Sequence, residues 1–523
     1  MWQPNYTPVA NSLAVSALIA ALPIFALLYL LGIARKPAWK SGLAGLLVAI
    51  AVALAAYHMP APMMVGAATY GAAFGLFPIG WIVYWAIVLY RLTIDTGKFE
   101  IIKDSIGSLT SDHRLQALLI AFAFGAFIEG AAGFGTPVAV AASMLSGLGF
   151  SPFYAAGICL LANTAPVAFG SIGIPLITLQ GVTGLPLSGL SANVGRICAP
   201  LSLLIPSYLV MVMCGWRGLL GVAPAAAVCG IAFAGAQFLV SSFLGPYLTD
   251  IIGSLSAILA LVALLQVWRP RATFQLDGHR SAESVRRPAS QVASAWMPYL
   301  LLVFFVALWG FSAVKAALDH ATVRFSWPML GGQKYTLNLL TASGTACMFA
   351  AIAGAAFLRV GPARFVGIMA ATFRQLALSL LTIAAVLALA FLMNFCGATT
   401  TLGLAFAATG AVFPFFSALL GWLGVFLTGS DTSANALFGK LQVVTANSLG
   451  LNPALMAAAN SSGGVMGKMI SLQSIAVAAA ATAMDSKLES SLFRFTLRHS
   501  VLLATLIGLI VLFYAYAAPG WVR

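Results

Sequence analysis

The sequence has little charge, and acidic residues are especially scarce. Of its 523 residues, 7% are charged, 12 are Asp or Glu and 61% are hydrophobic. Soluble domains have about 25% charged residues, so this composition excludes an ordinary soluble protein. Nearly uncharged stretches of about 20 residues recur from residue 13 to residue 518, and each is long enough to cross a bilayer. The sequence therefore predicts one all-α polytopic membrane domain over residues 1–523.

Three further absences narrow the function. The six cysteines lack the paired spacing of a metal site or a disulfide framework, and we expect no metal and no other cofactor. The chain contains no G-x-x-x-x-G-K-[ST] phosphate loop, which argues against direct ATP-driven pumping. Its basic residues are spread between apolar stretches despite a net charge of +14, so we expect a lipid bilayer and not nucleic acid around this protein.

Apolar runs predict twelve crossings and two re-entrant helical hairpins. The hairpins, at about 115–149 and 415–447, are apolar stretches interrupted in the middle by small and polar residues. The crossings are expected at about 13–34, 42–58, 70–91, 153–172, 195–214, 219–242, 250–268, 297–318, 337–358, 375–394, 454–483 and 500–518.

The distribution of Lys and Arg predicts the orientation in the membrane. With this topology, 19 of the 26 basic residues fall in loops on one side, including the polar loop 269–294. Because positive residues favour the cytoplasmic side, we expect that loop in the cytoplasm. Both termini are then expected at the periplasm or the cell exterior.

The two hairpins have the same local sequence pattern. GAFIEG at 125–130 matches GVFLTG at 424–429, and GFSP at 149–152 matches GLNP at 450–453. An internal repeat explains both matches, with cores at about 70–175 and 375–483; two unrelated Gly-rich stretches are the alternative. Since the charge pattern opens the hairpins to opposite sides, the expected architecture is the inverted repeat of secondary transporters.

Two acidic residues, Glu129 and Asp431, fall at the hairpin tips, whereas the other ten, Asp250 among them, fit in loops or at helix ends. An ionised carboxylate inside a membrane is expensive unless it is paired or hydrated, so an intramembrane acid is a candidate for function. We predict that Glu129 and Asp431 couple transport to protons. The alternative is a structural role, as a helix cap or as the partner of a lysine.

A dense run of hydroxyl and amide side chains follows the tip of the second hairpin. A helix that begins there would direct free N–H groups and the positive end of its dipole at an anion. A plain helix cap has the same composition and is the alternative. The predicted substrate-binding residues of this run are Ser430, Thr432, Ser433 and Asn435.

The facing groups are expected from two interrupted helices. Interruptions are predicted at NTAP, residues 163–166, and at NSSGG, residues 460–464, because Pro and paired Gly free backbone groups for a ligand. A kink without function is the alternative. A lysine just beyond the second interruption would pair with a carboxylate of the protein or of the substrate. The predicted substrate-binding residues here are Asn163, Thr164, Asn460, Ser461, Ser462 and Lys468.

The hairpin tips are rich in glycine, which lets a backbone approach a ligand closely. We predict this role for Gly130, Gly133, Gly135 and Gly429. Tight packing of small residues between membrane helices is the alternative.

Five motifs of this chain are specific enough to compare with known families. They are GAFIEGAAGFGTPVAV at 125–140, NTAPVAFGSIGIP at 163–175, GWRG at 215–218, GWLGVFLTGSDTSANALF at 421–438 and GKMISLQSIA at 467–476. These motifs resemble those of the bacterial lactate permease family. The similarity extends from the Asn5-Tyr6 region to the last helix. The polar stretch before residue 337 looks shorter than in some members, which concerns the external surface and not the core.

The resemblance implies proton symport of L-lactate, D-lactate or glycolate across the bacterial inner membrane. A proton also suits the physics, because it cancels the charge of a monocarboxylate that enters against a negative potential. The nearest rival is a sodium-coupled carboxylate transporter, since unwound backbone and hydroxyls also bind Na⁺. A channel or a membrane-embedded enzyme is the rival of another class, but no nucleophile, base or metal cluster for an enzyme is evident.

Overall fold

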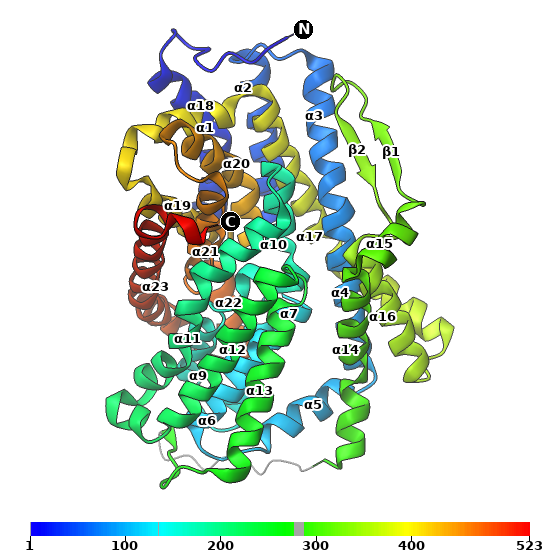
Figure 1. Ribbon diagram of the computed structural model, residues 1–523, viewed down its shortest axis with the longest axis vertical. Coiled ribbons are helices and arrows are strands. Elements are labelled where there is room, and N and C mark those ends of the chain that lie inside the picture. Colours follow the sequence, from blue (N-terminus) through cyan, green and yellow to red (C-terminus); the bar gives the residue numbers. More distant parts are fainter. Residues whose placement is uncertain (1, 134, 277–286, 523) are drawn as a thin grey trace.

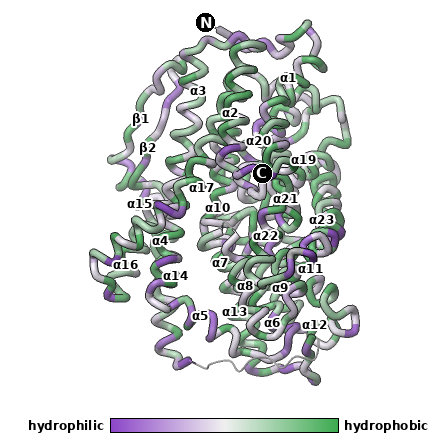
Figure 2. The backbone as a smooth tube through the Cα atoms, turned by 180° about the vertical axis from the view of Figure 1, so that it is seen from behind, coloured by the Kyte–Doolittle hydropathy of each residue, from purple (hydrophilic) through white to green (hydrophobic). Residues whose placement is uncertain are grey.

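Helices make up nearly all of the regular structure in the computed structural model, which describes residues 2–133, 135–276 and 287–522. Within these residues, twelve helical segments are long and apolar enough to span a membrane. Hydrophobic residues colour most of their length in Figure 2. The predicted fold class, a polytopic all-α membrane protein, is confirmed, with one small sheet added.

The elements follow the chain in a simple order. They are α1 (Leu13–Leu28), α2 (Ala38–Ala55), α3 (Ala61–Phe74), α4 (Trp81–Asp95), α5 (Lys98–Gly107), α6 (His113–Gln116), α7 (Gly125–Ala131), α8 (Thr136–Gly147), α9 (Pro152–Ala162), α10 (Gly170–Thr183), α11 (Leu187–Leu220), α12 (Ala223–Phe243), α13 (Thr249–Val267), α14 (Ala289–Gly310), α15 (Ser312–Asp319), β1 (Val323–Ser326), β2 (Lys334–Leu337), α16 (Ser343–Phe357), α17 (Pro362–Cys396), α18 (Ala398–Phe406), α19 (Phe413–Thr428), α20 (Asp431–Leu449), α21 (Pro453–Lys468), α22 (Leu472–Ala481) and α23 (Glu489–Leu512).

The described residues contain twelve candidate spans, the same number as the predicted crossings, but two of these spans are not the ones predicted. Two of the twelve, His113–Ala131 and Ala398–Thr428, contain the first arms of the predicted hairpins. The predicted crossing 153–172 is instead a pair of helices, α9 and the segment Val167–Thr183, bent by 64°. The bend follows Pro166 and continues through left-handed backbone at Ser171 and Ile172, so the interruption predicted at 163–166 is present.

The predicted helix 337–358 was placed too early, because residues 334–337 form a strand. This strand, β2, pairs with β1 in an antiparallel sheet beside α3 (Figure 1). The Tyr335 hydroxyl lies 2.7 Å from the carbonyl oxygen of Phe77 and 3.2 Å from that of Ala73. Both carbonyls belong to the bend around Pro78 that joins α3 to α4, so the sheet satisfies backbone groups that the bend frees.

The two ends of the molecule carry different parts of the chain. The N-terminus and the β1–β2 sheet lie towards one end, whereas α5, the last turns of α13 and the start of α14 lie at the other (Figure 1). The segment between α13 and α14 contains most of the predicted cytoplasmic loop 269–294. Its last residues, 289–294, belong to α14, and residues 277–286 lie outside the described residues.

A buried ion pair holds the start of that loop against the first hairpin. Arg114 Nη2 lies 2.6 Å from Asp112 Oδ2 and donates a hydrogen bond to the carbonyl oxygen of Ala272 at 2.8 Å. The same Asp112 oxygen accepts a hydrogen bond from the Phe274 amide at 3.0 Å. Because each charge is both paired and hydrogen-bonded, burial is tolerated here.

The two predicted hairpins have matching local geometry. In the first, α7 ends at Ala131 and α8 begins after Gly135, which has a left-handed φ of 80°. In the second, α19 and α20 are separated by Gly429, with φ of 72°, and Ser430. Only glycine adopts such backbone without strain, and it allows the chain to reverse. Both second arms also end in left-handed glycines, Gly149 and Gly450, before helices that begin with proline.

The interruption predicted at 460–464 is wrong, because α21 continues unbroken to Lys468 and the chain breaks at 469–471 instead. Glycines of this segment serve packing between α19 and α21. A Cβ atom at Gly463 would overlap the backbone of Ala418, and one at Gly421 would overlap the backbone of Asn460. Gly467 likewise contacts the carbonyl of Trp422. We call this contact between α19 and α21 the glycine seam.

We predict that Gly463→Ala destabilises the protein by about 1–3 kcal/mol, because the added methyl group has no space in the glycine seam. The matched control is Gly367→Ala on α17, where a Cβ atom would meet nothing within 4 Å. Thermal unfolding of both variants in detergent should show a lower Tm for the first and an unchanged or slightly higher Tm for the second. Equal Tm values would contradict the tight seam.

Candidate functional site

A cavity of about 150 Å³ lies between the tips of the two hairpins. Its polar lining comes from α7, α20 and α21 together with α10, α17 and α22. This volume is well below the roughly 300–1,000 Å³ typical of sites for drug-sized ligands, so the cavity suits a small solute. Predicted site residues that line it are Glu129, Gly135, Gly429, Ser430, Asp431, Thr432, Ser433 and Lys468.

An ion pair crosses this cavity from one hairpin to the helix that follows the other. Lys468 is the last residue of α21, and Glu129 lies in the last turn of α7. Their Nζ and Oε1 atoms are 3.6 Å apart, and both side chains are at least nine-tenths buried. At this distance the contact is electrostatic and not a hydrogen bond. The other oxygen of Glu129 has no hydrogen-bond partner among the described residues, so both groups remain available to a ligand or a proton.

Asp431 is held by a buried polar network. Its Oδ2 accepts a hydrogen bond from the Ser461 hydroxyl at 2.5 Å and one from Asn435 Nδ2 at 3.2 Å. Asn435 also lies 3.1 Å from the carbonyl of Pro175 and accepts a hydrogen bond from Asn460 at 2.9 Å. The Oδ1 atom has no such partner in the described part of the chain. Three predicted substrate residues, Asn435, Asn460 and Ser461, thus orient Asp431 and do not line the cavity.

Helix N-termini add positive potential to the cavity. Ser430 caps α20, and its hydroxyl accepts a hydrogen bond from the Ser433 amide. Gly135 precedes α8, and Gln473 and Ser474 belong to the first turn of α22. The first turns of three helices therefore border the same space, and the positive ends of their dipoles favour an anion there.

Several predicted site residues lie elsewhere. Asn163 and Thr164 are buried at the bend after α9, where Thr164 donates a hydrogen bond to the carbonyl of Leu161. Ser462 faces the thiol of Cys198. Gly130 packs against Asp250 and Ile251, and Gly133 packs against Ser171. Gly130 and Gly133 are thus tightly packed, which is the alternative to the predicted approach of their backbone to a ligand.

The structure adds polar residues that the sequence did not single out. Ser171 donates a hydrogen bond to the carbonyl of Ala132, which joins the bend of α10 to the first hairpin tip. Its left-handed backbone, with φ of 46°, could not be read from the sequence. The hydroxyl groups of Ser379 and Thr382 lie inside the apolar run of α17, and this pattern in the sequence could have indicated a polar lining. The added lining residues are Ser171, Ser379, Thr382, Thr428, Gln473 and Ser474.

Asp250 corrects the assignment of acidic residues. It lies at a helix end as expected, in the first turn of α13, but it is 1% exposed and not at a surface. Its Cβ atom lies against Gly130, the residue that follows Glu129. A third carboxyl is therefore buried beside the hairpin tip, and an acidic residue inside the folded membrane domain is a candidate for function.

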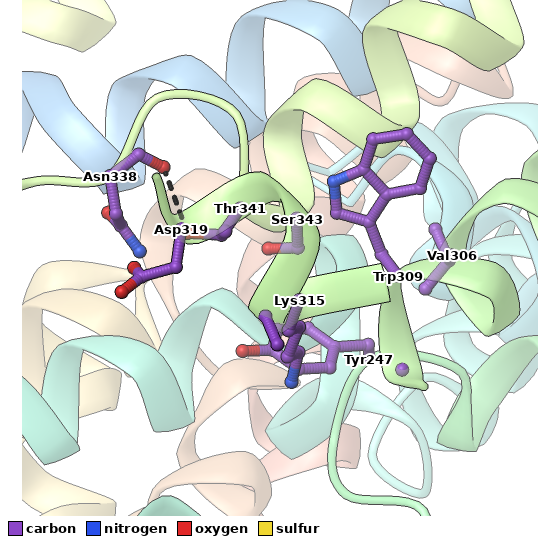
Figure 3. Close-up of a pocket in the computed structure, with 10 residues that line it drawn as sticks. Tyr247, Val306, Trp309, Lys315, Asp319, Asn338, Thr341 and Ser343 are labelled. Carbon is purple, nitrogen blue, oxygen red and sulfur yellow. Dashed lines mark hydrogen bonds between the residues drawn. The ribbon is translucent and has the colours of Figure 1, made fainter. Parts of the chain in front are cut away.

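A larger cavity of about 390 Å³ lies apart from this cluster, between the end of α14, α15 and the chain before α13 (Figure 3). Lys315 and Asp319 are its charged lining residues, and it contains no buried ion pair. We assign the candidate site to the smaller cavity because the buried charges converge there. Among the described residues, no group of three or more His, Cys, Asp or Glu side chains is placed to hold a metal.

Comparison with known proteins identifies relatives over the whole chain. The sequence model of the L-lactate permease family matches residues 16–518. The L-lactate permease of Bacillus subtilis is 46% identical over 97% of each chain, and the glycolate permease GlcA of Escherichia coli is 44% identical over 99% of each. The L-lactate permease of Salmonella typhimurium is 42% identical over 99% of this chain and 98% of its own.

Solved structures of two transporters are similar at low sequence identity. The efflux pump MtrF of Neisseria gonorrhoeae is 15% identical, with a TM-score of 0.46 over 86% of this chain and 83% of its own. The YdaH transporter of Alcanivorax borkumensis is 16% identical, with a TM-score of 0.47 over 88% of each chain. By its full-length match and by its relatives, this multi-pass membrane protein belongs to the L-lactate permease family.

Proposed function

We propose that this protein imports L-lactate, and also D-lactate or glycolate, together with a proton across the bacterial inner membrane. The named relatives transport lactate or glycolate, and the cavity has the size and the positive helix ends that a small carboxylate needs. One observation carries the proton coupling: the loose ion pair between Glu129 and Lys468 in that cavity. The protein acts as a carrier and not as an enzyme.

The ion pair suggests how a proton promotes substrate binding. When Glu129 takes up a proton, its attraction for the Lys468 ammonium is lost. The ammonium, 3.6 Å away, is then free to bind the carboxylate of lactate. Ser430, Thr432 and Ser433 offer hydroxyl groups to the substrate from the first turn of α20. Asp431, fixed by Ser461 and Asn435, keeps Lys468 in place and is the second candidate for proton exchange.

Charge balance supports one proton for each lactate. With Glu129 and Asp431 ionised and Lys468 protonated, the lining groups carry a net charge of −1. Binding one proton and one lactate anion leaves that sum unchanged, so loading buries no additional charge. Moving a lone anion into the cell would cost about 2.3 kcal/mol per 100 mV of inside-negative potential, and the proton cancels this cost.

The architecture proposed for transport is an inverted repeat with two re-entrant hairpins, one core at about 70–175 and the other at about 375–483. The matching left-handed glycines at the hairpin tips and at the ends of the second arms support it. The proposed orientation has both termini outside and the 269–294 loop in the cytoplasm. It is supported by the N-terminus, which lies at the opposite end of the molecule from the last turns of α13 and the start of α14 (Figure 1). Movement of one repeat-containing bundle against the remainder would expose the cavity to each side in turn.

We predict that purified protein in proteoliposomes accumulates radiolabelled L-lactate when an inward proton gradient is imposed. An inward sodium gradient of equal size should have no effect. Uptake that follows the sodium gradient and ignores the proton gradient would instead establish the sodium-coupled alternative.

Glu129→Gln should abolish accumulation driven by a proton gradient, because the amide cannot exchange a proton. Exchange of internal for external lactate should continue, since the neutral side chain resembles protonated Glu129 and leaves Lys468 free. Both rates are measured in the same proteoliposomes. Retention of proton-driven accumulation by this variant would remove Glu129 from the coupling mechanism.

Lys468→Gln should raise the Kd for lactate about 30-fold, or ~2 kcal/mol, because the substrate carboxylate loses its cation. Lys440→Gln is the matched control, since Lys440 lies on α20 but does not line the cavity. Binding is measured by isothermal titration calorimetry. The double variant Glu129→Gln/Lys468→Gln removes the unpaired carboxylate and should recover thermal stability without recovering affinity. An unchanged Kd in Lys468→Gln would exclude this lysine from the substrate site.

A further inference from the structure

Asp250 is a buried carboxyl that the mechanism above does not use. Neither of its oxygens has a hydrogen-bond partner among the described residues. Its side chain lies against Gly130, and Glu129 is close enough to act on it electrostatically. Two carboxylates that interact in a low-dielectric interior disfavour simultaneous ionisation. The pair is therefore suited to passing a proton from one carboxyl to the other.

In the described part of the chain, no cation faces Asp250 from the elements that pack most closely on α13. These elements are α7, α10, α12 and the π-helix Ala117–Phe124. Glu129 on α7 and Cys229 on α12 are their ionisable residues, and none of them contains Lys, Arg or His. The nearby Tyr247 and Cys198 are neutral groups. Asp250 thus lacks both arrangements that stabilise a buried carboxylate, a cation or a set of hydrogen bonds.

The larger cavity is lined by Tyr247, which precedes Asp250 by three residues in the sequence. The chain then enters α13 at Thr249. On its other walls are Lys315, Asp319 and Asn338 (Figure 3). Hydrogen bonds from Arg324 and Thr322 lower the pKa of Asp319, so this side chain is ionised at neutral pH. A cavity of about 390 Å³ with two charged side chains holds water.

We infer that Asp250 and this larger cavity form a proton access route to Glu129 that is separate from the substrate cavity. The inference rests on the proposed proton symport. Asp250 in its neutral form passes its proton to the Glu129 carboxylate, and water in the larger cavity then delivers a new proton past Tyr247 to Asp250. Asp250 and Glu129 are both neutral at the end of this step. The net result is one proton moved from the outer solution to the substrate site, and the substrate reaches Lys468 by its own path.

The first test compares Asp250→Asn with the wild type in two assays. Accumulation of lactate driven by a proton gradient should fall by roughly 10²-fold, the scale of losing a positioned proton-transfer group. Lactate exchange at equal pH should be unchanged, because the proton stays on Glu129 while the loaded carrier moves. Asp485→Asn is the matched control, as Asp485 is an exposed acid outside both cavities.

Each outcome decides the role of Asp250. Full proton-driven accumulation in Asp250→Asn would overturn the inference while leaving the proposed symport intact. Loss of exchange together with accumulation would assign Asp250 a purely structural role and would also overturn it. If the wild type itself ignored the proton gradient, the proposed function would fail, and this distinct result would be seen before any variant is made.

The second test blocks the larger cavity. Asn338→Cys places a thiol on its wall, where a bulky thiosulfonate reagent can attach. Modification should slow proton uptake, followed with an internal pH dye, and should leave lactate exchange unchanged. The unsubstituted protein, whose six cysteines are buried or half-buried, is treated in parallel as the control. Unchanged proton uptake after complete modification would exclude this cavity as the access route.

Discussion

The meeting of one ammonium group with two buried carboxyl groups is the constraint on which the rest of the site depends. Lys468 ends α21, Glu129 lies near the end of α7 and Asp431 begins α20. Three charges in an apolar interior are tolerated only where they compensate one another. The elements that carry them must therefore pack together, with Lys468 Nζ and Glu129 Oε1 3.6 Å apart, and the glycines, caps and bends of both hairpins serve this geometry.

Support for the charged groups comes from neutral polar side chains one layer further out. Asn435, Asn460 and Ser461 connect α20 to α21 and fix one oxygen of Asp431. Such a layer limits the positions that a carboxylate can take, and this precision matters more than additional attraction would. Among the described residues, no hydrogen bond fixes Glu129 in this way. Asp431 is thus suited to stay in place, whereas Glu129 is suited to change its partner.

Much of the fold and the charged part of the site followed from the sequence. Scarcity of charge and the spacing of apolar runs located ten of the twelve predicted crossings, and isolated acids in apolar stretches pointed to Glu129 and Asp431. Local pattern failed where tertiary contacts decide. NSSGG at 460–464 has the composition of a break, yet it remains helical because its glycines meet the α19 backbone and its polar side chains find partners. Asp250 was missed because its burial depends on α7, which is distant in sequence.

The glycine seam also has a mechanical consequence. Where backbone meets backbone without side chains between them, two helices have no clearance to slide or tilt separately. A displacement of α19 should therefore move α21, whose last residue is Lys468. Through this contact we expect the thickness of the surrounding bilayer to act on the position of the ammonium group, which would make lipid composition a variable of the site's chemistry.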